Sequence, residues 1–462
     1  MSEKMTMENP LGSQPINRLI WKFAIPGIIS QLVNSTHNIV DQAFLGWGVN
    51  DLAIGATNVA FPFTTIMTAV SALIGMGAAS HFSILLGKKQ TDEAGDHIGN
   101  AIALMAVFGL SIALVASAFL EPILYLFGAT DRIMEYAFPY ARVICLGIPF
   151  GIFATGMSYF VRADGSPSYA SAILLSGAVF NILFDPIFLF LFDTGITGVA
   201  LATVLGQVLS AALAVFYLLK KMKTVSLTRA NFRIRQDVVG GIFALGSAIF
   251  FNHILATIVQ IVLMNAMKKY GALSVYGSEV VIAASGAVSK LSIVFLSSII
   301  GIATGCQPIL GYNLGNKQYD RVRKTYLLAL RYGTTVAVAA FLLLQLFPST
   351  LLKLFGSDDP LFYEFATRYI RIYFAMMFLN ALQPITSTFC TAIGKAKMGF
   401  LMTIVRQGIL MLPLILLLPG SFGIDGVLLA GSISDGLTAL VVAAIGYREV
   451  KRLHKLQEEA AS

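Results

Sequence analysis

The chain has 462 residues, of which 56% are hydrophobic and only 12% are charged, and its mean hydropathy is +0.77. Soluble domains carry about 25% charged residues, so the composition excludes an ordinary soluble enzyme or binding domain and indicates a protein embedded in lipid. The net charge of +8 is compatible with a nucleic-acid partner, but the positions of the basic residues favour another explanation.

Apolar segments of about 20 residues, long enough to cross roughly 30 Å of hydrocarbon, recur along the whole chain. The connections between them are short, so no soluble domain of useful size remains. The sequence therefore predicts an all-α integral membrane protein with about twelve transmembrane helices. They are expected near residues 17–46, 52–86, 95–120, 134–161, 169–192, 196–222, 239–268, 275–313, 324–348, 363–392, 398–419 and 424–448.

Lysine and arginine are concentrated in alternate loops, whereas the other loops lean acidic. Basic loops stay on the cytoplasmic side of a membrane, so we expect both termini inside the cell and a multi-pass protein of the cell (inner) membrane. The charge then reports topology, and no nucleic-acid partner is expected. The basic set is Lys88, Lys89, Arg162, residues 220–235, residues 317–324, Lys395, Lys397 and residues 448–455; the acidic set is Asp51, Asp131, Glu135, Asp193, Asp358, Asp359 and Asp425, with Lys268 and Lys269 as exceptions.

Residues 1–18 are polar and lack a small-residue cleavage site, so no cleaved signal peptide is expected. The three cysteines, Cys145, Cys306 and Cys390, all fall inside apolar segments. An odd number without CxxC spacing argues against disulfides or a metal cluster. We expect them to be packing residues.

The sequence contains an internal repeat. LGKKQTD at 86–92 returns as LGNKQYD at 314–320, and GITGVALA at 195–202 returns as GIDGVLLA at 423–430, both 228 residues later. Each copy holds six helices, an even number, so the copies face the same way, and transporters with such repeats place substrate where the copies meet. We predict an N-terminal lobe at 1–219, a cytoplasmic linker at 220–238 and a C-terminal lobe at 239–462.

Motifs for energy-converting or hydrolytic chemistry are missing from the sequence. It has neither the GxxxxGK[ST] loop that cradles nucleotide phosphates nor an HExxH or nucleophile–base pattern, and its five histidines are scattered. We therefore expect no enzymatic activity, no catalytic residue, no metal and no cofactor. Transport driven by a proton or sodium gradient is the remaining explanation.

The first helix carries a polar face in an apolar setting. Gln31, Asn34, Asn38 and Asp41 are spaced by three, four and three residues, which places them on one side of a helix, with His37 beside them. The asparagines could form a polar seam that joins helices. Asp41 needs a further reason, because an ionised carboxylate at the bilayer centre costs about 2.5–3.5 kcal/mol on insertion scales.

A second buried acid lies in the fifth helix. Asn181 and Asp185 are four residues apart and Pro186 follows, while Pro26 lies in the first helix. Proline removes a backbone donor and frees a carbonyl acceptor. Burial and a nearby carboxylate both favour a protonated carboxyl group, so the two acids are candidates for a proton or small-cation site. Their proximity is a hypothesis, because the sequence does not place helices one and five together.

The second lobe lacks this pair of acids. Alignment of FAIPG with FALGS puts Ile261 where Asp41 lies, and the tenth helix offers Asn380 and Gln383 without a mid-helix acid. Lys290, in the eighth helix, either reaches the interface or faces a central cavity. Asp435, in the last helix, is either structural or a secondary buried acid.

Four segments resemble the multidrug and toxic compound extrusion (MATE) family. These are NIVD in the first helix, RADGSP after the fourth, FNILFDPIF in the fifth and GCQPILGYNLGNKQYDRV after the eighth. The likeness extends over about residues 15–450 and is similar to the prokaryotic branch that includes the DNA-damage-inducible F proteins. It implies twelve helices in two six-helix lobes arranged as a V, alternating access, and antiport of cationic, amphipathic drugs against protons or sodium.

The resemblance also implies roles for particular residues. The coupling residues fall on Asp41, Asn181, Asp185 and Thr203. The fourth helix lacks an asparagine that some relatives use, and the seventh and tenth lack the acids of a second-lobe sodium site, so coupling in the first lobe is favoured. The residues expected to line the substrate cavity are Gln31, Asn34, His37, Asn38, Lys290, Asn380 and Gln383.

The partners that we expect are small organic cations and membrane lipid, with the protein acting as a monomer. One alternative is a lipid-linked precursor flippase of the same superfamily, but such a cavity needs several basic residues and only Lys290 is a candidate. Another alternative is a structural or channel protein, which the paired acids disfavour.

Overall fold

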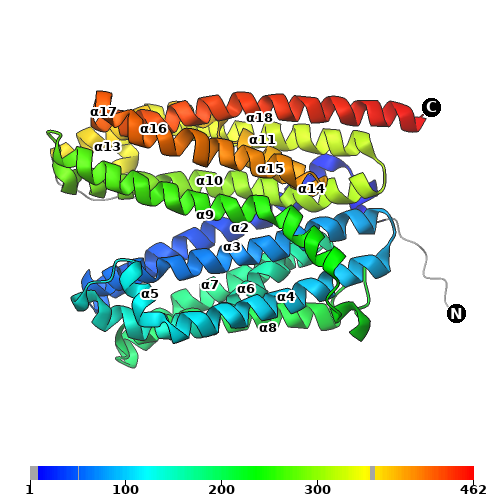
Figure 1. Cartoon of the computed structure of the whole chain (residues 1–462), viewed down its shortest axis with the longest axis horizontal. Helices are drawn as coiled ribbons and strands as arrows, with labels where there is room; N and C mark the ends of the chain where they lie inside the picture. Colours follow the sequence, from blue (N-terminus) through cyan, green and yellow to red (C-terminus); the bar gives the residue numbers. More distant parts are fainter. Residues whose placement is uncertain (1–8, 50, 354–358, 462) are drawn as a thin grey trace.

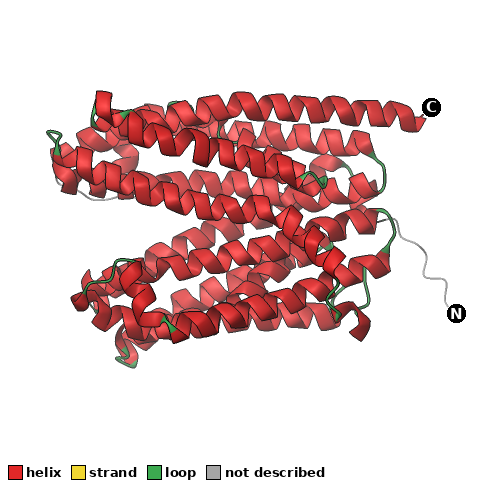
Figure 2. Cartoon of the chain, in the orientation of Figure 1, coloured by secondary structure: helices red, strands yellow, loops and turns green. Residues whose placement is uncertain are grey.

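The structure is a computed structural model that describes residues 9–49, 51–353 and 359–461. Figure 2 shows helices joined by short loops, with no strand in these described ranges. The short helix α1 (Pro10–Ser13) precedes the long helices and begins with a proline at its first turn. Proline suits that position because the first N–H groups of a helix have no partner within the helix.

Two helical bundles make up the molecule. The first contains α2 (Ile16–Gly48), α3 (Asp51–Gly87), α4 (Thr91–Ala118), α5 (Leu120–Leu126), α6 (Asp131–Ala163), α7 (Pro167–Pro186) with the π turn η1 (Ile187–Leu191), and α8 (Gly195–Lys220). The second contains α9 (Gln236–Ala272), α10 (Gly277–Gly315), α11 (Tyr319–Leu346), α12 (Pro348–Leu352), α13 (Pro360–Tyr373), η4 (Met377–Leu379), α14 (Leu382–Ala392), α15 (Ala396–Thr403), η5 (Ile404–Met411), α16 (Leu412–Leu417), α17 (Pro419–Phe422) and α18 (Ile424–Ala461). The 3₁₀ turn η2 (Arg229–Phe232) lies in the connection between them.

The predicted membrane segments correspond to this set of helices. Ten helical spans in the described part of the chain are long and apolar enough to cross a membrane. With α2 and the broken segment formed by α13, η4 and α14, the number becomes twelve, as the sequence predicts. The last helix differs from the prediction, because α18 continues beyond residue 448 to Ala461 and carries the basic C-terminal residues in helical form.

The tenth span is interrupted for a local reason. The helix stops at Tyr373, passes through η4, and resumes at Leu382 with Pro384 in its first turn. Because proline has no N–H and clashes with the carbonyl four residues earlier, a continuous helix through Asn380 is disfavoured. The break leaves Asn380 and Gln383 on either side of an irregular turn.

The internal repeat is visible in the backbone as well as in the sequence. Lys89 and Lys317 lie 228 residues apart and both adopt positive φ, 62° and 57°. Gly195 and Gly423 share the same spacing and the same φ of 58°. Positive φ is uncommon outside glycine, so its recurrence at one interval indicates two copies of one topology.

Small residues let the two lobes touch. A methyl group on Gly246 of α9 would lie 1.8 Å from the Leu73 carbonyl oxygen of α3, and one on Gly27 of α2 would lie 3.1 Å from the Gly301 carbonyl oxygen of α10. Close backbone approach of this kind stabilises helix pairs in lipid. In Figure 1 the bundles approach each other towards the end that holds both termini and diverge towards the other end, which gives the V shape.

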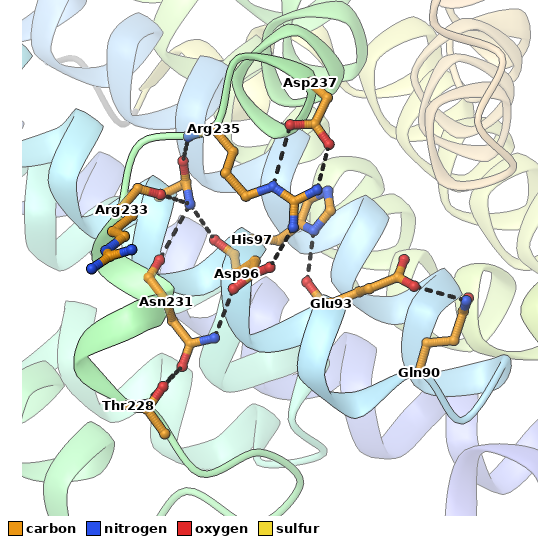
Figure 3. Close-up of polar contacts among 10 residues, drawn as sticks. Gln90, Glu93, Asp96, His97, Thr228, Asn231, Arg233, Arg235 and Asp237 are labelled. Atoms are coloured by element: carbon orange, nitrogen blue, oxygen red, sulfur yellow. Dashed lines mark hydrogen bonds and ion pairs between the residues drawn. The ribbon is translucent and has the colours of Figure 1, made fainter.

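The connection between the lobes is fastened to the first lobe. Asn100 of α4 donates to the carbonyl oxygens of Asn231 and Arg233 and accepts from the Arg235 N–H, and Arg235 pairs with Asp96 at 2.9 Å (Figure 3). Asn100 has no exposed surface. The stretch of chain after α8 is therefore held in a defined path along the base of the first lobe.

The three cysteines are buried and free. Cys145 lies in α6, Cys306 in α10 and Cys390 in α14. Burial inside helices, without a disulfide among them, agrees with the packing role that the sequence predicts.

Candidate functional site

A crossing of two glycines positions the polar residues of α7 and α8. A methyl group on Gly206 would lie 2.6 Å from the Gly177 carbonyl oxygen, so the two backbones are nearly in contact. Asn181 is four residues beyond Gly177, and Thr203 is three residues before Gly206. Three or four residues make about one helical turn, so both side chains lie one turn from the crossing, on adjoining helix faces.

Asn181 is the centre of the hydrogen-bond network that follows. Its Nδ2 donates to Asp185 Oδ1 at 3.0 Å and to Thr203 Oγ1 at 3.1 Å. Thr203 Oγ1 in turn donates to the Val199 carbonyl oxygen at 3.0 Å, which orients its lone pairs towards the amide. Asn181 is 2% exposed and Asp185 is 0% exposed. The amide therefore orients one oxygen of a fully buried carboxyl group.

The structure brings Asp41 of α2 to this group. The Asp41 and Asp185 carboxyl groups interact through a side-chain hydrogen bond. Two ionised carboxylates offer only acceptors, so this bond exists when one of them carries a proton. His37 Nε2 lies 4.0 Å from Asp41 Oδ2, one helical turn away on α2.

Three acceptor oxygens of the cluster have no conventional donor. Asp41 Oδ1, Asn181 Oδ1 and Asp185 Oδ2 are all buried and receive no hydrogen bond from a protein donor group in the described part of the structure. Leaving a buried polar atom unpaired costs about 1–3 kcal/mol, and more for a charged group. A proton between the carboxyl groups would supply a donor for the two acids, whereas a small cation would be a ligand partner for all three oxygens.

Tyr140 of α6 belongs to the same cluster and is not among the residues predicted from sequence. Its ring is close enough to Asp41 and Asp185 to interact electrostatically with both. Pro139 precedes it within α6. A tyrosine next to a proline in a membrane helix is a weak signal, because tyrosines are common near membrane interfaces, and only its place beside the two acids in the folded structure identifies it.

Six of the seven expected cavity residues divide into three groups. Gln31 and His37 are partly buried on α2. The side chains of Asn34 and Asn38 lie outside the described part of the structure, so their predicted roles stay predictions. Asn380 and Gln383 are partly buried beside the break in the tenth span.

Lys290 lies at a depth that matches the polar face of α2. It is partly buried in α10 and forms no ion pair among the described residues. It precedes Gly301, the residue that touches Gly27 of α2, by eleven residues, which is about three turns of one helix face. Since α2 and α10 run in opposite directions, the same interval on α2 leads from Gly27 to position 38. This geometry favours the cavity over the interface for Lys290.

Asp435 has a partner that the sequence did not reveal. Arg406 Nε and Nη2 lie 3.0 and 2.9 Å from Asp435 Oδ1, and the Asp435 side chain is 6% exposed. Arg406 is presented by the π segment η5, and Ser434 Oγ donates to its carbonyl oxygen at 3.1 Å. A charge pair compensates the buried acid of the second lobe, whereas the acids of the first lobe have each other. Arg406 is the one basic residue within the predicted segment 398–419, and that isolation was the available signal.

Comparison with known proteins agrees with this geometry. A sequence profile of the MatE family matches residues 26–187 and 248–417, more than half of the chain. Multidrug export protein MepA of Staphylococcus aureus (strain MRSA252) is 26% identical over 435 residues, and the match covers 94% of each protein.

Solved structures share the fold over nearly the whole length. An outward-facing multidrug resistance MATE family transporter of the MOP superfamily has a TM-score of 0.90 at 21% identity, covering 98% of this chain and 100% of that one. The MATE multidrug transporter DinF-BH, solved in complex with a ligand, has a TM-score of 0.87 at 30% identity, covering 95% and 96%. With the two-lobed helical fold and the profile match, these findings show that the chain belongs to the multidrug and toxic compound extrusion family, whose members are multi-pass transporters of the cell membrane and not enzymes.

Proposed function

We propose that the protein exports cationic, amphipathic organic compounds in exchange for protons, with residues 1–219 and 239–462 as the two moving lobes and residues 220–238 as their linker. The observation that carries the proposal is the cluster of Asp41, Asn181 and Asp185. Each contributes a buried oxygen that receives no hydrogen bond from a protein donor group among the described residues. Sites of this kind bind a proton or cation, because burial penalises an unpaired charge.

In the protonated form, the two acids hydrogen-bond to each other without a donor from another residue. One proton placed between Asp41 and Asp185 supplies the donor for their mutual hydrogen bond, and Asn181 holds the other Asp185 oxygen at 3.0 Å. With the shared proton in place, the pair carries a single negative charge instead of two. In this form α2 and α7 are drawn together at the level of Asp41.

Loss of that proton leaves two negative charges that need a positive counterion. Two carboxylates in contact repel each other, and the nearby His37 and Tyr140 cannot neutralise both. A cationic compound in the space between the lobes would compensate the partly buried Asp41, whose side chain is 15% exposed. Drug and proton then compete for one site, and each shifts the conformational equilibrium by its differential affinity for the two states.

The class of substrate is supported by the relatives. A protein that is 26% identical over 94% of the chain is named a multidrug export protein, and DinF-BH, at 30% identity, is described as a multidrug transporter. The cluster described above holds two acids and one amide, which suits organic cations.

A flippase for lipid-linked anions is the alternative function. It needs a cationic cavity, and in the described part of the chain the cavity candidates contribute only Lys290, because Arg406 is neutralised by Asp435. If Lys290→Ala abolished the transport of lipid-linked anions while dye efflux persisted, the flippase would be the better explanation.

Sodium is the alternative coupling ion, since carboxylate, amide and hydroxyl oxygens also bind hard cations. The experiment that separates the possibilities is efflux of a cationic fluorescent dye from cells and uptake into everted vesicles, first under an imposed pH gradient and then under an imposed sodium gradient. We expect transport with the pH gradient alone. Transport under the sodium gradient alone would show that sodium is the coupling ion. If neither gradient drives transport, the proposal is wrong.

A further inference from the structure

A cavity outside the proton site lies at the end of the first lobe where the termini are. Its volume is about 460 Å³, and it is bounded by the start of α2, by the loop between α6 and α7 with the first turns of α7, and by the connection after α8. Lys22 of α2 and Lys223 of the connection contribute the cations, and Tyr169 and Ala172 of α7 are among the lining residues.

Positive charge exceeds negative charge around this cavity. Lys22 and Lys223 are exposed and form no ion pair in the part of the chain that the structure describes. The acid in the adjoining loop, Asp164, is 4% exposed and already occupied. Its Oδ2 accepts from the Tyr217 hydroxyl and the Lys223 N–H, and its Oδ1 accepts from the N–H and hydroxyl of Thr224.

Asp164 has a further effect, because its bond to the Lys223 N–H fixes the backbone from which the lysine side chain extends. The neighbouring Lys221 adds to the charge, with its Nζ 4.8 Å from the centre of the Tyr169 ring. The cations are thus built into a defined rim and do not belong to a freely moving loop.

An apolar path leads from the cations along the helices. Ile25 and Ile29 follow Lys22 at intervals of three and seven residues, which places all three on one face of α2. Ile25 is 48% exposed and Ile29 is 45% exposed. On α7, Val179 continues the line of Ala172 seven residues further and is 47% exposed. A ligand with an anionic head and an apolar tail matches this combination, whereas a small soluble anion uses only the cations.

We propose that this cavity binds the phosphate headgroup of an anionic phospholipid, with an acyl chain along Ile25 and Ile29. Lys22 is six residues into α2, about 9 Å along the helix, a depth that suits a headgroup. The predicted topology puts the cavity in the cytoplasmic leaflet, where anionic lipids attract basic segments. The proposal rests on that topology and not on the coupling ion.

Such a lipid would join two helices of the first lobe to the connection between the lobes. It would tie the base of α2, which carries Asp41 further along, to the base of α7 and to the connection between the lobes. Transport should then be faster in membranes that contain anionic lipid, whichever organic cation is transported.

The test compares Lys22→Gln/Lys223→Gln with Lys268→Gln/Lys269→Gln, a matched change at two exposed lysines near the C-terminal end of α9, at the other end of the membrane span. Binding of phosphatidylglycerol and phosphatidylcholine to the purified full-length protein is measured by native mass spectrometry, with circular dichroism to confirm folding. We expect phosphatidylglycerol to bind tighter than phosphatidylcholine, and the first variant to lose about 30-fold in its affinity, the loss expected for two surface lysines. The Lys268/Lys269 variant should retain wild-type affinity.

Competition separates a lipid from a free anion. Neither inorganic phosphate nor glycerol phosphate at millimolar concentration should displace the lipid, because neither can use the apolar path. Displacement by either would make the cavity a soluble-anion site and overturn the proposal. Equal affinity for the two lipids, or equal losses in both variants, would also overturn it. If the double variant does not fold, the single changes Lys22→Gln and Lys223→Gln carry the same comparison, each with about a fivefold loss.

Discussion

Replacement of Asp41 by asparagine removes the exchangeable proton of the site while it keeps the shape of the side chain. Asparagine is nearly isosteric with a protonated aspartic acid, and its amide can donate to Asp185 Oδ2, which receives no hydrogen bond from a protein donor group among the described residues. The hydrogen bond between helices α2 and α7 is therefore kept, and the folding free energy should change by no more than one hydrogen bond, about 1 kcal/mol. What is lost is the exchangeable proton, because the amide holds Asp185 as a carboxylate.

The magnitude follows from the number of protons released. If one proton leaves when one cationic dye binds, the affinity of the wild-type protein rises with pH by up to about tenfold per pH unit, since one unit corresponds to about 1.4 kcal/mol per proton. In Asp41→Asn the affinity should be flat with pH, and coupled efflux should be lost.

Dye binding is measured by fluorescence polarisation on protein in lipid nanodiscs, between about pH 5 and 8, alongside dye efflux from cells at matched expression. Asp193→Asn is the control, because Asp193 is exposed and its φ of 51° is one that asparagine tolerates. It should behave like the wild type. A well-expressed Asp41→Asn protein with full efflux and the wild-type dependence of affinity on pH would refute the reasoning.

Three further predictions follow from the contacts of named residues. Asp185→Asn should impair transport, and combining it with Asp41→Asn should add little in an efflux assay, because residues that act as one unit are strongly non-additive; losses that multiply would mean that the carboxyl groups act separately. Arg406→Leu should destabilise the second lobe by about 3–5 kcal/mol, since it strands a buried Asp435, and Asp435→Leu in the same chain should recover most of this loss in thermal unfolding; equal stability of all variants would rule out a structural ion pair. Lys290→Gln should raise the affinity for cationic dyes by removing a like charge at the depth of the site, and unchanged binding would place Lys290 outside the cavity.

Much of the fold follows from composition and spacing. Apolar length gave the membrane segments, and the interval of 228 residues gave the repeat, which the backbone shows again at Lys89 and Lys317. The end of α18 was missed because the basic residues after 448 end an apolar segment without ending a helix. Hydropathy reports where lipid ends, and the helical hydrogen bonds of α18 continue past that point.

The candidate site could be predicted from the sequence only in part. Asp41, Asn181 and Asp185 could be named from the sequence, because polar residues are costly in an apolar helix, whereas Thr203 was named only through the family resemblance. That they meet depends on the contact between Gly177 and Gly206 and on the packing of α2 against α7, which no pattern within one helix encodes.

Arg406 and Tyr140 could not be identified from the sequence for the same reason. Each is unremarkable within its own segment and acquires its meaning from a partner on another helix. Sequence reasoning that proceeds one helix at a time can detect the buried acid Asp435, but it cannot identify Arg406 as the cation that neutralises it.

Proton release on substrate binding tests the central claim most directly. The heat of binding of a cationic dye is measured calorimetrically at one pH in two buffers that differ in ionisation enthalpy, for the wild type and for Asp41→Asn. The account predicts a buffer-dependent heat for the wild type, which corresponds to release of protons from the Asp41–Asp185 pair, and a buffer-independent heat for the variant. Equal heats in both buffers for the wild type, with dye bound, would contradict the account and leave Asp41 as a residue of helix packing.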